Sequence, residues 1–189
     1  MEFNHGTELL ELCEKNRAPI SLIMKRREAE FSRISEEKVE EKMRKVLEIM
    51  KESARKPLKN PLPSIGGLIG GEARKLKEYH EKGRSVCGDL MSRAITYAMA
   101  VLEVNASMGV IVAAPTAGSS GVVPGVLLAL QEEYDLPDEE ILKGLYTAGA
   151  VGYLLMKNAS VAGAEAGCQA EVGSASAMAA AAAVEVMGG

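Results

Sequence analysis

Apolar side chains recur at intervals of three and four along the first third of the chain. Charged residues of both signs fill the positions between them, as in EEKVEEKMRKVLEIMKE. This spacing gives a helix one apolar face and one solvated face, so we predict amphipathic helix from about residue 7 to 56. The apolar positions that define the face are Leu9, Leu10, Leu12, Ile20, Ile23, Met24, Val39, Met43, Val46, Leu47 and Met50.

The helical pattern breaks at KNPLPSIGGLIGGE, where prolines and glycine pairs cluster. We expect a linker there, with a glycine-rich loop lying against a ligand as the alternative. Beyond it the run MGVIVAA is either a strand or the end of a buried helix, because periodicity cannot decide so short a run. We predict an all-α fold, with a charged helical arm over residues 1–63 and a helical domain over 64–189. The helices expected in that domain cover 72–82, 89–105, 141–155 and a last segment beginning near Ser174.

The segment between residues 104 and 131 is long and mostly apolar, which raises the question of whether it spans a membrane. It contains Pro115 and Pro124 and a central cluster of glycine and serine, so it is no continuous apolar span. Mean hydropathy is +0.02. We therefore expect no membrane association. The competing interpretation is a fragment of a membrane transporter, in which a broken helix faces the substrate.

Charge and cysteine usage narrow the class of protein further. The net charge is -4, and residues 1–84 hold 19 Lys/Arg against 15 Asp/Glu, whereas residues 85–189 hold 3 against 11. The alternating signs of the first part indicate a solvated helix face rather than a nucleic-acid patch, and we expect no nucleic-acid partner. The three cysteines lie far apart without CxxC spacing, and the acidic N-terminus does not look like a secretory signal, so we expect a cytoplasmic protein.

Two loops rich in Gly, Ser and Thr directly precede apolar helices, at residues 114–125 and 163–177. The first backbone N–H groups of a helix have no partner within it, so such junctions can bind an anion. In the first loop Thr116, Ser119 and Ser120 add hydroxyl donors, and Gly118 permits a tight turn. The alternative is that these residues only cap helices and let them pack closely.

Cys168 lies in the second loop, a few residues before the expected helix start. The helix dipole favours a thiolate there, and a thiolate is either a nucleophile or a metal ligand. The two histidines, His5 and His80, are distant in sequence, and neither is a persuasive partner for nucleophilic catalysis. From the residues alone, a buried and unreactive thiol remains the alternative.

Two long segments carry a family resemblance. LMSRAITYAMAVLEVNASMGVIVAAPTAGSSGVVPGVLLAL and NASVAGAEAGCQAEVGSASAMAAAAAVEVMGG resemble the α subunit of bacterial iron-sulfur-dependent L-serine dehydratase, a lyase of serine catabolism and gluconeogenesis. The resemblance spans the chain and is closest over residues 64–189. It implies an all-helical catalytic domain holding a [4Fe-4S] cluster. Cys168, in the motif GAExGCQxE, would be one cluster ligand.

The reaction that the resemblance implies is loss of water from L-serine, giving pyruvate and ammonia. An iron with an open coordination position would act as a Lewis acid on the substrate hydroxyl. The cradle for the substrate carboxylate would be the loop of Thr116, Gly118, Ser119 and Ser120. The general base stays unassigned. Polar neighbours of the cluster loop would hold its backbone or meet the substrate amine, with a purely structural role equally open; they are Asn158, Ser160, Glu165 and Gln169.

The family's α part continues beyond the MGG at which this sequence stops, and further cluster cysteines lie in that continuation. Cys13 and Cys87 fall outside the ligand motifs. We therefore expect the 189-residue chain alone to hold no stable cluster and to be inactive. Its expected partners are a serine dehydratase β subunit or β domain and further chains of a homo-oligomer or heteromer. A non-catalytic helical scaffold is the remaining alternative, and the preference between serine and threonine stays open.

Overall fold

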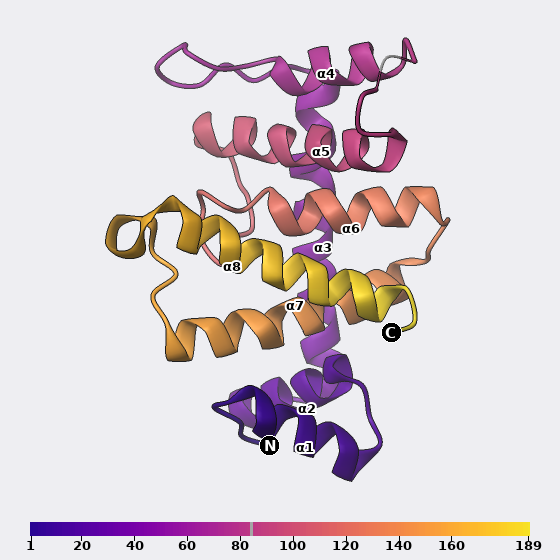
Figure 1. Cartoon of the computed structure of the whole chain (residues 1–189), viewed down its shortest axis with the longest axis vertical. Helices are drawn as coiled ribbons and strands as arrows, with labels where there is room; N and C mark the ends of the chain where they lie inside the picture. Colours follow the sequence, from indigo (N-terminus) through magenta and orange to yellow (C-terminus); the bar gives the residue numbers. More distant parts are fainter. Residues whose placement is uncertain (84) are drawn as a thin grey trace. The chain divides into compact units, whose positions relative to one another are not determined.

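The computed structural model describes residues 1–83 and 85–189, and within them every regular element is an α-helix (Figure 1). This confirms the all-α prediction. The MGVIVAA run is neither strand nor helix but irregular backbone that follows the end of α5. No helix among the described residues is long and apolar enough to cross a membrane. The helices are α1 (Gly6–Asn16), α2 (Ile20–Ser32), α3 (Glu36–Lys59), α4 (Glu72–His80), α5 (Asp89–Ala106), α6 (Val122–Glu133), α7 (Asp138–Asn158) and α8 (Gly163–Val186).

The first amphipathic stretch forms three helices rather than one continuous helix. α1 and α2 each end at an arginine with left-handed backbone, Arg17 at φ 49° and Arg33 at φ 54°. The N–H of Arg17 bonds back to the carbonyl of Glu14, and that of Arg33 to Glu30, which closes each helix end. These turns carry no glycine, the residue that most often marks such a helix end, although Glu36 and Glu37 after Ser35 did indicate the start of α3.

The chain forms two compact units, and each is described by itself. Unit 1 contains residues 1–46 and 137–189, and unit 2 contains residues 47–136. The boundaries of unit 2 therefore fall inside α3 and just before α7. The division at residue 63 that composition suggested stays a prediction.

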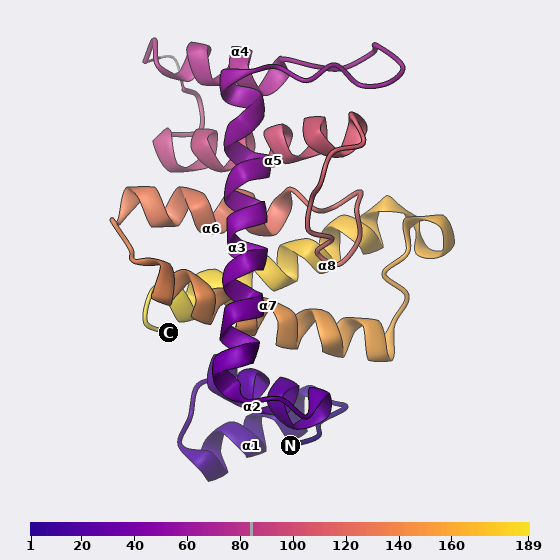
Figure 2. The same cartoon turned by 180° about the vertical axis from the view of Figure 1, so that it is seen from behind.

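In unit 1, α7 packs against both α2 and α8, and the pair α7 and α8 lies side by side in both views (Figures 1 and 2). Gly152 of α7 makes this close approach possible. A Cβ there would lie 2.8 Å from Cε of Met178 in α8. The rest of the interface is built from small residues, since Ala148, Ala175 and Ala179 are all buried.

Within unit 1, an arginine inside an aromatic cluster joins the N-terminal segment to α7. Arg27 of α2 is only 7% exposed, and its guanidinium carbon lies 4.0 Å from the ring centroid of Tyr153 in α7. Phe3 meets Tyr153 edge to face at 5.5 Å. The cation–π contact compensates in part for burying the guanidinium charge.

In unit 2, α5 packs against both α4 and α6, and both views show it between them (Figures 1 and 2). Glycines allow the backbones of α5 and α6 to touch. A Cβ at Gly121 would lie 2.4 Å from the carbonyl oxygen of Ala98, and one at Gly125 would lie 2.7 Å from that of Ala94. The start of α6 is therefore fixed against the middle of α5.

Two glutamates cap helices that lack a side-chain cap of their own. Glu103 of α5 is 3% exposed and accepts the N–H of Ala73 at 2.8 Å, in the first turn of α4. In unit 1, Glu185 of α8 accepts the N–H of Ser21, in the first turn of α2, and the hydroxyl of Thr147. Each carboxylate satisfies a helix donor that has no partner within its own helix, and it complements the positive end of the helix dipole.

The cap on α4 yields a prediction for stability. Glu103→Ala removes the acceptor and leaves a buried N–H unmet, so we expect the free energy of unfolding to fall by about 2 kcal/mol. Glu103→Gln keeps an acceptor oxygen and is expected to lose about half as much. Urea denaturation followed by circular dichroism measures both. The exposed Glu52→Ala is the control, and a loss at Glu103 no larger than the control's would contradict the capping role.

The contact between α5 and α6 yields a second stability prediction. Gly121→Ala places a methyl group against a backbone carbonyl that cannot move aside, so we expect a loss of about 2 kcal/mol. Gly173→Ala is the matched control, because nothing lies within 4 Å of the added Cβ and alanine favours the helix. Thermal unfolding compares the two. If both variants melt at or above the wild-type temperature, the close contact is not a constraint.

Candidate functional site

The loop over residues 114–121 connects α5 to α6 in unit 2, and its two serines point inward. Ser119 and Ser120 are 2% and 0% exposed. The hydroxyl of Ser119 donates to the carbonyl of Ala114 at 3.3 Å, and that of Ser120 to the carbonyl of Ala117 at 2.7 Å. Both hydroxyls therefore hold the shape of the loop instead of presenting donors to solvent. The carboxylate-cradle role predicted for them stays a prediction.

The other two predicted cradle residues lie nearer the surface. Thr116 is half-buried, with its Oγ1 3.1 Å from Oγ of Ser119, and Gly118 is exposed. Asn105, at the end of α5, ties the loop down because its Nδ2 donates to the carbonyl of Ala117 at 3.1 Å. Sequence reasoning missed Asn105, since a polar residue at a helix end gives no signal of a partner twelve positions ahead.

The start of α6 carries no compensating group from its own sequence. Its N-cap is Gly121, which makes no side-chain cap hydrogen bond, and its first turn contains no acidic residue. The positive end of the helix dipole therefore faces the loop without a local carboxylate, although the N–H of Val122 already bonds to the carbonyl of Ser119 at 3.1 Å. This arrangement suits an anionic group such as a substrate carboxylate.

In unit 1, Cys168 stands directly at a helix start, closer than the sequence suggested. α8 begins at Gly163 rather than near Ser174, but it is interrupted at Gly167, whose φ of 82° and ψ of 163° are not helical. Cys168 is the first residue beyond this break, and its side chain is exposed. The alternative of a buried thiol is thus wrong for this residue, whereas its reactivity stays a prediction.

The predicted polar neighbours of Cys168 divide into two groups. Ser160 donates to Oε2 of Glu165 at 2.6 Å, so these two residues order the short segment that leads into α8. Asn158 instead points away from this segment, because its Nδ2 donates to the carbonyl of Asn4 at 2.8 Å. Gln169 is exposed beside Cys168. A role for any of the four toward a cluster or substrate stays a prediction.

The other two cysteines offer little support for a metal site. Burial and then the negative charge of Glu185 raise the pKa of the Cys13 thiol, which disfavours the thiolate that a metal binds. Cys87 is exposed, with its Sγ 3.4 Å from Oγ of Ser92. Across residues 1–83 and 85–189, no three His, Cys, Asp or Glu side chains gather in a way that could hold a metal ion. Within the described residues Cys168 is therefore one exposed thiol and not a complete site.

Comparison with known proteins agrees with these features. The family described as "Serine dehydratase alpha chain" matches residues 14–189. The probable L-serine dehydratase alpha chain of Bacillus subtilis is 44% identical over 187 residues, which are 99% of this chain and 62% of that protein. The L-serine dehydratase alpha chain of Peptoniphilus asaccharolyticus is 42% identical over 98% of this chain and 64% of its own. The L-serine dehydratase of Streptomyces coelicolor is 36% identical over 99% of this chain and 41% of its own.

The chain thus spans less than two thirds of the length of these curated relatives. The family match nevertheless includes both loops described above, the one before α6 and the one that carries Cys168. The resemblance expected from the two sequence segments is confirmed. The chain belongs to the serine dehydratase alpha chain family.

Proposed function

We propose that this chain is part of an L-serine dehydratase, which removes water from L-serine to give pyruvate and ammonia. The observation that carries the proposal is the break at Gly167, which puts an exposed Cys168 at the start of a long helix within the family's matched region. Relatives bearing this activity in their names align along nearly the whole chain. No observation favours the alternatives of a non-catalytic scaffold or a transport fragment.

The substrate carboxylate binds at the start of α6. Its negative charge meets the uncompensated end of the helix dipole and the backbone N–H groups of the preceding loop. Thr116 supplies a hydroxyl near the surface, whereas the hydroxyls of Ser119 and Ser120 hold the shape of the loop. Holding the carboxylate fixes the orientation of the α-carbon, from which a base removes the proton. The base itself is not assigned to a residue of this chain.

The iron-sulfur cluster that the family resemblance implies does not fit the described residues as a complete site. A [4Fe-4S] cluster needs several thiolates, and the described residues gather no such group around Cys168. Cys168 itself fits as a single ligand, because its side chain is exposed at the start of the long part of α8. We infer that it is one ligand of a cluster whose other thiolates are supplied by further protein.

The active enzyme also contains a partner subunit or domain. Two of the matched relatives are named as alpha chains, which implies a partner chain in those enzymes. In this protein the partner is a β subunit or β domain, assembled in the cytoplasm. The chain's own contribution is the carboxylate-binding loop and the Cys168 thiolate.

The substrate-binding role of the loop predicts a specific kinetic effect. In the complete enzyme, Thr116→Val removes one hydroxyl from the carboxylate site, and we expect KM for L-serine to rise about fivefold with little change in kcat. Thr7→Val makes the same change at an exposed site on α1 and is expected to leave KM unaltered. Steady-state kinetics of pyruvate formation measures both. Equal KM values in the two variants would exclude Thr116 from the substrate site.

The ligand role of Cys168 predicts coupled loss of colour and activity. In the complete enzyme, Cys168→Ser should abolish most of the visible absorption of the cluster and lower kcat more than about 100-fold. Cys87→Ser, at another exposed cysteine, should change neither. Because Cys168 is exposed, circular dichroism should show unchanged helix content in both variants. A Cys168→Ser enzyme that keeps its absorption and its activity would refute the assignment.

A further inference from the structure

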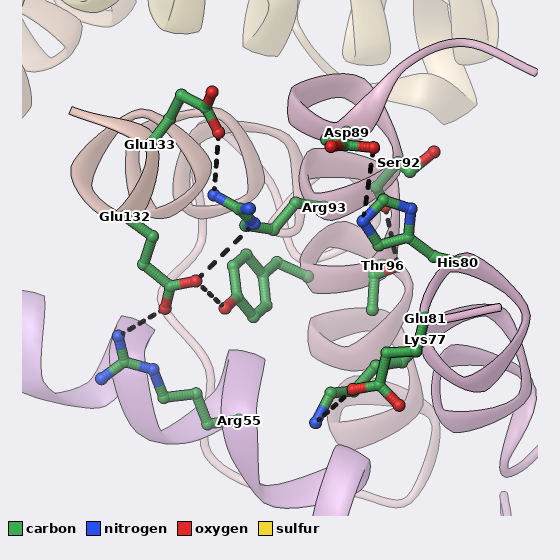
Figure 3. A network of polar contacts seen from close by, with 11 residues as sticks. Arg55, Lys77, His80, Glu81, Asp89, Ser92, Arg93, Thr96, Glu132 and Glu133 are labelled. Atoms are coloured by element: carbon green, nitrogen blue, oxygen red, sulfur yellow. Dashed lines mark hydrogen bonds and ion pairs between the residues drawn. The ribbon is translucent and has the colours of Figure 1, made fainter. Parts of the chain in front are cut away.

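A polar cavity of about 250 Å³ lies in unit 2, apart from the loop before α6, and none of its residues has a role in the proposed function. Four helices build it, with α3 on one side and α4, α5 and α6 on the others. The volume suffices for a small organic or inorganic ion. Figure 3 shows the charged side chains that surround it. The lining residues are Leu58, Lys77, His80, Glu81, Arg93, Thr96, Tyr97 and Glu132.

His80 is the residue in this cavity whose hydrogen bonding is least satisfied. Its Nδ1 is buried without a partner among the described residues. Its Nε2 lies 3.9 Å from Oδ1 of Asp89, beyond hydrogen-bond distance. The side chain is 21% exposed, so solvent reaches the ring only partly. An imidazole always has at least one N–H to donate, and leaving it unmet is costly.

The carboxylate of Glu132, in the cavity wall, already has hydrogen-bond and ion-pair partners. Glu132 accepts the hydroxyl of Tyr97 at 2.6 Å and the guanidinium of Arg55 at 3.0 Å, as drawn in Figure 3. Burial, and then the hydrogen bond with Glu132, raises the pKa of Tyr97 to about 12, so its hydroxyl stays a donor at neutral pH. Glu132 therefore has little capacity left for a cationic ligand.

The side chains of the cavity that can still form hydrogen bonds to a ligand are donors. Arg93 donates to Glu133 at 3.2 Å and lies 3.9 Å from Glu132, which uses only part of its five N–H groups. The Nζ of Lys77 lies 3.5 Å from Oε1 of Glu81. This ion pair is loose, and its two side chains are 49% and 58% exposed. Such exposed pairs contribute little and exchange readily for another anion. Guanidinium and ammonium groups accept no hydrogen bonds, so the ligand they favour is an acceptor.

We propose that this cavity binds a small anion through carboxylate or phosphate oxygens. Lys77 and Arg93 supply the positive charge, and His80 supplies a ring nitrogen whose hydrogen bonding is unmet. A carboxylic acid and inorganic phosphate share this chemistry, and the experiment below separates them. The inference does not rest on the proposed function, because none of these residues belongs to the Cys168 loop or to the loop before α6.

Histidine NMR signals offer a direct test, since the 189-residue chain contains only His5 and His80. Sodium acetate and sodium phosphate are titrated separately into the chain at fixed pH and fixed ionic strength maintained with chloride. We expect the imidazole signals of His80 to shift saturably with at least one anion while those of His5 stay in place. Saturation by acetate alone assigns a carboxylate ligand, and saturation by phosphate alone assigns a phosphate.

Two lysines on α4 provide matched variants. Lys77→Ala removes one cation from the cavity and should weaken the apparent affinity at least about fivefold. Lys75→Ala removes an exposed lysine two residues away that does not line the cavity, and its titration should match that of the wild type. The proposal is overturned if His80 does not respond to either anion, if His5 shifts equally, or if both variants titrate alike.

Discussion

Two carboxylates, one buried and one half-buried, hold the beginnings of helices that have no side-chain cap of their own. Glu103 takes this role for α4 and Glu185 for α2, and in each case the acceptor comes from a helix distant in sequence. Burying a carboxylate is expensive unless hydrogen bonds and a favourable dipole offset the cost, and a helix start supplies both. The position of α4 then determines where Lys77 and His80 meet α5. The cap therefore sets the geometry of the polar cavity as well as the stability of unit 2.

Small residues decide where the reactive loops lie. Gly121 brings the start of α6 onto the carbonyl of Ala98, so the loop before α6 must turn within a few residues of α5. In unit 1, Gly152 lets α8 approach α7 over the side chain of Met178, and Cys168 begins the long part of α8 beyond its break. Close packing of backbones leaves little freedom for such segments. Gly121 thus fixes the position of the loop before α6.

The sequence predicted the type of each element better than its ends. Periodicity and composition were enough for an all-α fold, and Asp89 was placed correctly at the start of α5. The left-handed turn at Arg17 was missed because arginine is uncommon in that conformation. The capping role of Glu103 could not be predicted from the sequence, since its partner in α4 is thirty residues away. The inward direction of Ser119 was equally hidden, because local sequence does not state which carbonyl a hydroxyl will reach.

The helix starts of this chain fall into two kinds, and the difference bears on function. Those of α2 and α4 receive a protein carboxylate, which satisfies their donors and occupies the space in front of them. The start of α6 has no side-chain cap and no acid in its first turn, so a carboxylate from outside would meet an uncompensated helix dipole there. The start beyond Gly167 instead presents the thiol of Cys168. The proposed function rests on this difference between helix starts that a protein carboxylate fills and one that no acid compensates.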